Sequence, residues 1–176
     1  MNIFVAGVHG VGKTHLASRL PEAFGMTHTS ASKLIREERA MPNWGADKKV
    51  NDIDGNQAAL ATAVKRHNTA GTRLLLDGHF VLLNDQREFS RLEPTVFASL
   101  NLNGVILLED APQTIAQRIQ ERDDRKEDIK HIAEFIAVER QQAETVCHIL
   151  GIPLHVLNCP RTDTFCEAIM AITSPK

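Results

Sequence analysis

The sequence predicts an α/β protein built in three layers, with a five-stranded parallel β-sheet and helices on both of its faces. Five short apolar runs end in polar or turn residues, and segments with helical periodicity separate them. Continuous apolar runs are typical of strands that are buried on both faces, as they are in parallel sheets. A glycine-rich turn directly after the first run predicts a loop at the carboxyl edge of that sheet.

The predicted strands follow one another along the chain in a regular alternation. The first covers Asn2–Ala6, and the second, Met26–Thr29, is the least apolar of the five. The other three cover Arg73–Asp77, Gly104–Glu109 and Pro153–Asn158. Several of these runs stop at a polar side chain, so we expect polar residues to gather at the carboxyl edge of the sheet.

Helical periodicity predicts four helices between the strands. The first, Thr14–Leu20, follows the glycine-rich turn; Gln57–His67 and Pro112–Glu121 each carry apolar residues on one side. The longest, Asp128–Leu150, stops at Gly151, a residue typical of helix ends. Its predicted core-facing stripe consists of Ile129, Ile132, Ile136, Ala143, Cys147 and Leu150.

We expect the whole chain of 176 residues to form a single domain, because no linker or internal repeat interrupts the alternation. Two polar segments lack a strong apolar face, Met41–Gly55 and Arg122–Asp128. They are predicted to be mobile covers that close over a site and exclude water.

Composition excludes several classes of function. The net charge of −2 and the pI of about 6.4 provide no general basic field for DNA. The eight histidines and three cysteines show no zinc-ligand spacing and no CxxC pair, so we expect reduced thiols and no structural zinc. No run approaches the ~18 apolar residues of a membrane span, and the N-terminus has no basic leader, which favours a cytoplasmic protein.

The segment Gly7–Thr14, GVHGVGKT, matches the pattern GxxxxGK[ST] in full, between a predicted strand and a predicted helix. Glycines let such a loop curl until its backbone N–H groups surround a polyphosphate, and the start of the next helix adds partial positive charge. A chance GKT in a glycine-rich turn is the alternative, and the flanking elements disfavour it. We therefore predict ATP as cofactor, bound by Gly7, His9, Gly10, Val11, Gly12, Lys13, Thr14 and His15.

Two further residues near strand ends are candidates for this site. Asp77 ends the LLLD run and, with the hydroxyl of Thr14, is predicted to hold Mg²⁺. Its alternative role is that of a turn-forming Asp-Gly pair. His79 is a candidate contact for the phosphate or the acceptor, and an ordinary loop histidine fits the pattern equally well.

Three arginines, Arg118, Arg122 and Arg125, cluster at the end of the helix that follows the fourth strand. Four-residue spacing places the first two on one helical face. Phosphoryl transfer needs cations that stabilise the negative charge of the moving group, so the three are predicted to be catalytic together with Lys13, and Arg118 also to contact ATP. The alternative is a solvated helix end in which they pair with nearby acids.

These pieces together resemble the adenylate-kinase-like nucleoside monophosphate kinases, especially their compact archaeal-type and broad-specificity branches, within the P-loop NTPase superfamily. The resemblance rests on GVHGVGKT, the stretch Ser32–Arg36, the strand end LLLDGH, the segment RxxxRDDR and the closing GIPL. It implies that Arg36 holds the acceptor phosphate, that residues 31–70 bind the acceptor and that residues 118–128 form a short lid. It departs from the family where Phe80–Leu83 replaces a proline-arginine pair and in its lack of tyrosine.

The sequence favours transfer of the ATP γ-phosphoryl group to a nucleotide over three alternatives. A small-metabolite kinase that phosphorylates a neutral hydroxyl calls for a carboxylate base near the end of the second strand, and THTSAS offers none. A regulatory or assembly ATPase with a protein or RNA partner stays open, because the missing proline-arginine pair weakens the acceptor site. A GTPase is disfavoured because no Asn-Lys-x-Asp element follows the fourth strand.

Glu139 and Arg140 interrupt the apolar stripe of the longest helix. One hypothesis is that both side chains turn to solvent along the edge of the stripe. The other is that Arg140 turns inward as a further cation of the substrate site, where it must meet phosphate or a carboxylate such as Asp77 or Glu109.

Overall fold

The computed structural model describes residues 1–39, 53–84 and 86–174. Its main sheet is parallel and has five strands in the order β2-β3-β1-β6-β7. These strands are β1 (Asn2–Ala6), β2 (Met26–Ser30), β3 (Arg73–Asp77), β6 (Leu102–Glu109) and β7 (Leu154–Asn158). All five predicted strands are confirmed, with ends that differ from the prediction by at most two residues.

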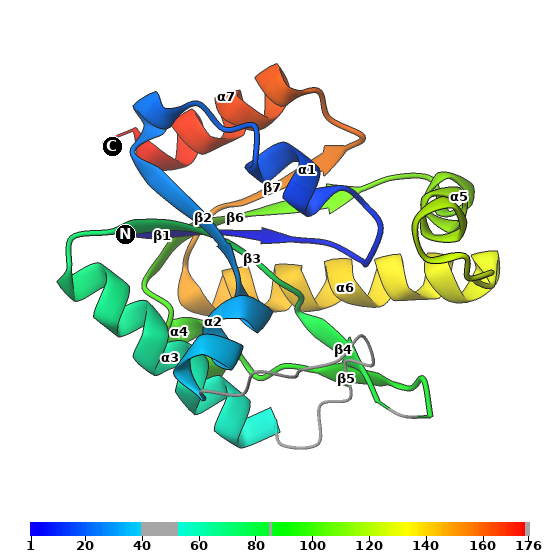
Figure 1. Cartoon of the computed structure of the whole chain (residues 1–176), viewed down its shortest axis with the longest axis horizontal. Helices are drawn as coiled ribbons and strands as arrows, with labels where there is room; N and C mark the ends of the chain where they lie inside the picture. The colour runs from blue at the N-terminus through cyan, green and yellow to red at the C-terminus, as the bar shows by residue number, and fades with distance from the viewer. Residues whose placement is uncertain (40–52, 85, 175–176) are drawn as a thin grey trace.

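Helices cover both faces of this sheet, which confirms the three-layer α/β architecture (Figure 1). One layer holds α1 (Lys13–Ala17) and α7 (Thr162–Thr173), and the other holds α3 (Ile53–Thr69), α4 (Pro94–Ala98) and α6 (Ile129–Leu150). The helix α5 (Pro112–Asp123) stands beyond the carboxyl ends of the strands. The helix α2 (Ala31–Glu38) directly follows β2, and a short 3-10 turn at Glu22–Phe24 precedes β2.

The helix boundaries differ from the prediction in places. The predicted helix Thr14–Leu20 stops at Ala17, because the N–H groups of Arg19 and Leu20 bond three residues back in a tightened last turn before Pro21. The helix predicted from Gln57 begins at Ile53, so the end of the predicted segment Met41–Gly55 is helical. Residues 41–52 of that segment lie outside the described residues.

An antiparallel hairpin that the sequence did not predict follows β3. It pairs β4 (Val81–Leu83) with β5 (Phe89–Arg91) outside the main sheet. Phe80 leads into it and is fully buried, with its ring centroid 5.2 Å from that of Phe4. The apolar residues after Asp77 therefore leave the sheet and anchor a separate ribbon.

The buried face of α6 differs from the predicted stripe. Ile129 is 44% exposed, and Phe135 and Val146 are buried where the prediction left them out. Glu139 is buried among these apolar residues with 1% exposure, so the hypothesis that it turns to solvent is wrong.

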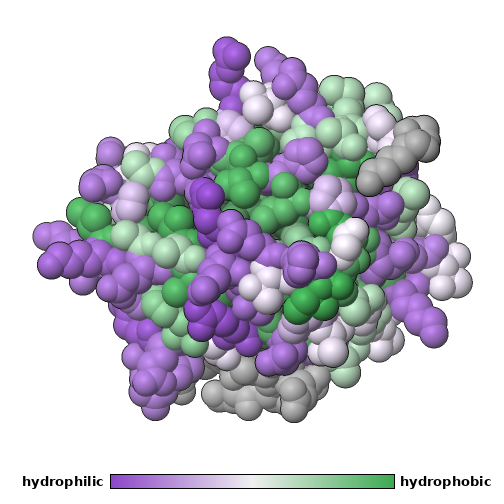
Figure 2. Space-filling model, turned by 180° about the vertical axis from the view of Figure 1, so that it is seen from behind, coloured by the Kyte–Doolittle hydropathy of each residue, from purple (hydrophilic) through white to green (hydrophobic). Residues whose placement is uncertain are grey.

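The face seen in Figure 2 mixes hydrophilic and hydrophobic residues. Across the described part of the chain, the large hydrophobic side chains with substantial exposure are Met1, Ile129, Ile149 and Met170. No helix in this part combines the length and the apolar character that a membrane crossing requires.

Candidate functional site

The loop from Gly7 to Gly12 joins β1 to α1 at the carboxyl edge of the sheet, next to β3 and β6. At Gly7 the backbone has φ of +136°, and a Cβ atom there would lie 2.4 Å from the carbonyl oxygen of Leu108 in β6. At Gly10 a Cβ atom would lie 2.8 Å from the side chain of Ile119 in α5. The loop is thus threaded between a strand and a helix that leave no room for side chains at these positions.

Gly7→Ala should destabilise the protein by about 3 kcal/mol or more, because it combines an unfavourable φ with a backbone clash. Gly71→Ala is the matched control, since Gly71 has φ of +80° but nothing within 4 Å of the added atom. Thermal or urea unfolding of the two variants measures the difference. Equal stability losses would mean that the loop can shift away from β6 at no cost.

Lys13 is folded into the loop that precedes it. Its ammonium group donates hydrogen bonds to the carbonyl oxygens of Gly7 at 2.6 Å and Val8 at 3.3 Å, and the residue is only 8% exposed. A full positive charge therefore lies inside the loop, where a phosphate group on the loop N–H groups would meet it.

Thr14 and Asp77 meet at the start of α1. The Thr14 hydroxyl lies 3.4 Å from Asp77 Oδ2, and the same oxygen lies 2.8 Å from His28 Nε2 on β2. A hydroxyl and a carboxylate are oxygen ligands of the kind that Mg²⁺ prefers, so the donor set fits the predicted ion. The sequence analysis did not predict His28 as a neighbour of this pair, because it could not predict the order of the strands in the sheet.

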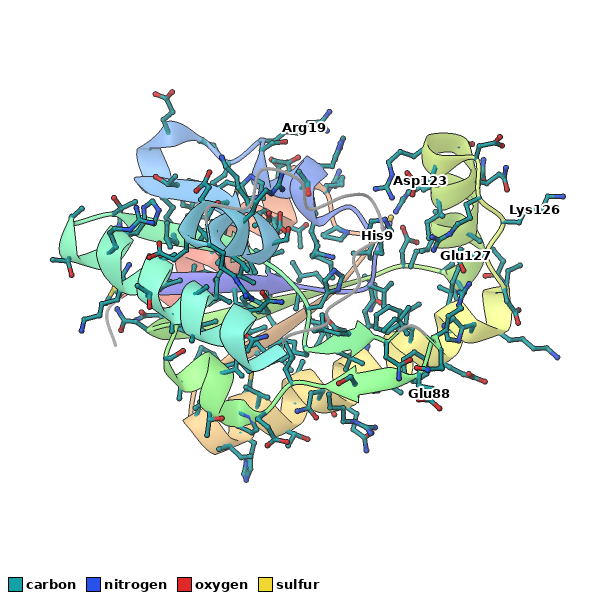
Figure 3. The ribbon with its side chains drawn as sticks, turned by 60° about the horizontal axis from the view of Figure 1, so that its bottom comes forward. His9, Arg19, Glu88, Asp123, Lys126 and Glu127 are labelled. Atoms are coloured by element: carbon teal, nitrogen blue, oxygen red, sulfur yellow. The ribbon has the colours of Figure 1, made fainter. Side chains whose placement is uncertain are left out.

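Two of the predicted arginines reach the loop from α5. Arg118 donates to the carbonyl oxygen of Val11 at 3.3 Å and pairs with Asp110 at 2.8 Å. Arg122 contacts both the ring of His9 and the carboxylate of Asp123. Figure 3 shows His9 and Asp123 directed towards each other across the space between the loop and α5. The predicted shared face of the helix therefore does border the glycine-rich loop.

The remaining predicted cations occupy different surroundings. Arg125 pairs with Glu127 in the connection between α5 and α6, and Glu127 also binds Arg87 of the hairpin connection. Arg36 is exposed on α2. Among the described residues, no hydrogen bond or ion pair joins either of these two arginines to the glycine-rich loop.

Arg140 meets a carboxylate, one of the two that the sequence suggested. Its Nε donates to Glu109 Oε1 at 2.7 Å, and a second bond joins the same two side chains. Glu109 ends β6, so this pair lies at the carboxyl edge of the sheet, and the Arg140 side chain is 41% exposed. Its contact with a substrate stays a prediction.

The histidines of the predicted site also differ in their surroundings. The His79 side chain is 22% exposed, stacks near the ring of Phe135 and lies 3.9 Å from the carboxylate of Glu139. His15 is exposed on α1 and contacts Arg19 of the next turn.

Glu139 is a part of this region that the sequence analysis missed. Its carboxylate accepts hydrogen bonds from the backbone N–H groups of Gly7 at 3.3 Å, Phe80 at 3.0 Å and Val81 at 2.8 Å. Burial raises the pKa of Glu139 to about 7, against the opposing effect of these N–H groups and of the positive charge on Lys13. A signal existed in the sequence, since Glu139 continues the three- and four-residue steps of the buried residues of α6.

The raised pKa of Glu139 predicts a pH dependence of stability. The folded protein binds this proton more tightly than the unfolded chain, whose glutamate has a pKa near 4.5. The stability that the proton provides is therefore complete below about pH 4.5 and is lost as the pH rises through 7. Between pH 5 and pH 8 the wild type should lose on the order of 1–3 kcal/mol relative to Glu139→Gln, which cannot titrate. Parallel urea-unfolding curves of the two proteins across this range would contradict the raised pKa.

Comparison with known proteins shows which family and which fold this chain shares. Residues 6–135 match the family described as "AAA domain". Two strains of Halobacterium salinarum have a protein named "Putative adenylate kinase" that is 29% identical to this chain over 129 residues. That match covers 72% of this chain but only 62% of the relatives, so it spans under two thirds of their length.

Solved structures share the fold at low sequence identity. A tunicamycin resistance protein from Deinococcus radiodurans aligns with a TM-score of 0.62 at 14% identity, over 99% of this chain and 96% of the other. A gluconokinase from Sinorhizobium meliloti aligns with a TM-score of 0.54 at 13% identity, over 97% and 90%. The fold and the resemblance to adenylate-kinase-like P-loop kinases are confirmed, and the chain belongs to the AAA domain family of P-loop proteins.

Proposed function

We propose that this protein is an ATP-dependent phosphotransferase that passes the γ-phosphoryl group of ATP to a small acceptor, and that this acceptor is a nucleoside monophosphate. The observation that carries the proposal is the convergence of Lys13, Arg118 and Arg122 on one glycine-rich loop. The name of the Halobacterium salinarum relatives supports a nucleotide as the acceptor.

In this proposal, separate residues bind the ATP phosphates, the Mg²⁺ ion and the phosphoryl group that is transferred. The loop N–H groups and Lys13 bind the phosphates of ATP, while Thr14 and Asp77 hold Mg²⁺. Mg²⁺ neutralises part of the charge on the phosphate oxygens when it is bound. Arg118 and Arg122 stabilise the negative charge of the moving phosphoryl group.

The pairing of Arg118 with Asp110 has a consequence for this role. The acid fixes the guanidinium group next to the loop before ATP arrives, so less side-chain freedom is lost on binding. Because a nucleotide phosphate is already ionised at neutral pH, this chemistry needs positioning and positive charge more than a general base.

A regulatory or assembly ATPase is the second candidate, and the β4–β5 hairpin favours it. The hairpin occupies the stretch where the resemblance would place a proline-arginine pair for the acceptor. Such a protein would hydrolyse ATP slowly and respond to a protein or RNA partner.

A small-metabolite kinase is the third candidate. It shares the fold, as the likeness to the gluconokinase shows, but that likeness extends to the fold alone.

A coupled assay of ADP release separates these candidates. The protein is incubated with Mg-ATP alone, then with each nucleoside monophosphate, and then with a panel of hydroxyl-bearing metabolites such as sugar acids. ADP release that depends on a nucleoside monophosphate, with formation of the matching diphosphate, supports the proposal. Release that is independent of any acceptor supports the ATPase, and release that requires a hydroxyl metabolite supports the third candidate.

A further inference from the structure

A buried carboxylate joins the two segments that carry the candidate phosphate and metal residues. Glu139 projects from α6 and bonds to the N–H of Gly7, the first residue of the glycine-rich loop. It also bonds to the N–H groups of Phe80 and Val81, directly after the turn that carries Asp77 and His79. The residue is 1% exposed, so these bonds lie away from bulk water.

The same loop residue is held from its other side by the candidate phosphate-binding cation. The carbonyl oxygen of Gly7 accepts a hydrogen bond from Lys13 at 2.6 Å, while its N–H donates to Glu139. Glu139 and Lys13 therefore fix one residue between opposite charges. Movement of Lys13 towards a phosphate would leave the N–H of Gly7 still tied to α6.

We propose that Glu139 is a positioning residue, whose carboxylate fixes the position of the glycine-rich loop relative to the turn that carries Asp77 and His79. The inference rests on the proposed function, because it concerns the same nucleotide site. A carboxylate suits this place because it can accept several N–H bonds at once, and charge-assisted bonds of this kind are stronger than neutral ones. Glutamine keeps the shape but presents an NH₂ group towards backbone donors, so it cannot reproduce the set.

If Glu139 were merely structural, its substitution would lower stability without altering nucleotide binding. Another residue of α6 provides this comparison. Gln142 is also buried, and its amide donates to the carbonyl oxygen of Leu92 at 2.7 Å, away from the glycine-rich loop. Gln142→Met should lower the melting temperature and leave ATP affinity within about twofold of the wild type. Glu134→Gln, on the exposed side of the same helix, should change neither.

The first test needs no turnover. In the wild type, the backbone amide NMR signals of Gly7, Phe80 and Val81 should titrate together near neutral pH, and in Glu139→Gln this shared titration should be absent. The charged or titratable groups that face the Glu139 carboxylate from other described elements are Lys13 of α1 and His79 after β3. His79→Gln is therefore measured in parallel, and it should leave the shared titration in place. Loss of the titration in that variant, with its retention in Glu139→Gln, would overturn the proposal.

The second test measures function. Calorimetric titration with Mg-ATP should show affinity reduced at least tenfold in Glu139→Gln and within about twofold of the wild type in Gln142→Met and Glu134→Gln. Where an acceptor supports turnover, kcat should fall by a larger factor than KM for the acceptor rises. Unchanged ATP affinity together with a lowered melting temperature would overturn the proposal and leave Glu139 as a structural residue. A wild type that binds Mg-ATP but transfers no phosphoryl group would overturn the proposed kinase and would leave the ATP-affinity comparison intact.

Discussion

Lys13→Ala should lower the turnover of ATP by about 100-fold to 1,000-fold. The wild-type ammonium group lies inside the loop, where it can follow the charge that develops between the β- and γ-phosphates. A loss of this size corresponds to roughly 3–4 kcal/mol of transition-state stabilisation. Steady-state ADP release, with the acceptor that the panel identifies, measures it.

The substitution also removes two hydrogen bonds within the loop, so stability must be followed separately. Lys13→Met retains most of the side-chain volume and should show the same loss of turnover with a smaller change in melting temperature. Lys130→Ala, at an exposed position on α6, is the control for the loss of a lysine and should leave turnover unchanged. Near-normal turnover in a folded Lys13→Met would exclude the ammonium group from catalysis.

The main sheet could be predicted because most of its strands are largely apolar runs separated by helical segments, and the weaker run of β2 follows the same alternation. The hairpin after β3 could not be predicted, since each of its strands has only three residues and the second of them, FSR, is not an apolar run. Short strands of this kind gain most of their stability from tertiary contacts, here the burial of Phe80 beside Phe4 and Phe97.

Part of the site was visible from spacing alone. The four-residue step between Arg118 and Arg122 correctly placed both on one face of a helix, and the structure brings that face to the loop. The helix after the loop is shorter than expected, with five residues, so it carries a smaller dipole than a helix of seven would. Lys13 and the loop N–H groups therefore supply a larger share of the positive charge than they would beside a helix of seven residues.

Glu139 shows why the remaining part of the site was missed. A glutamate within an apolar stripe looks like an interruption, because burying an unpaired charge is costly. The steps from Ile132 and Phe135 to Glu139 and Val146 are nevertheless those of one continuous buried face. The cost is partly offset by N–H groups in the segments that follow β1 and β3, and the positions of these segments depend on the order of strands in the sheet. Only the folded chain reveals such partners.

Asp77→Asn should lower turnover by roughly 100-fold and raise the Mg²⁺ concentration needed for half-maximal activity. Asp77 lies at the end of β3 beside the Thr14 hydroxyl, where a negative charge attracts the ion that these two residues are proposed to hold. Asparagine preserves the size of the side chain and one oxygen but removes that charge. ADP release measured over a range of Mg²⁺ concentrations provides both quantities.

The bond between Asp77 and His28 supplies an alternative explanation that a second variant can separate. Asp77→Asn also weakens the 2.8 Å contact with His28 Nε2, so a loss of activity could arise from a displaced β2. His28→Asn breaks the same contact while leaving the carboxylate in place. If Asp77 acts through the ion, His28→Asn should retain a near-normal Mg²⁺ requirement, and Asp163→Asn, at an exposed position in α7, should match the wild type. An identical Mg²⁺ requirement in Asp77→Asn and the wild type would instead assign Asp77 to holding β2 and β3 together through His28.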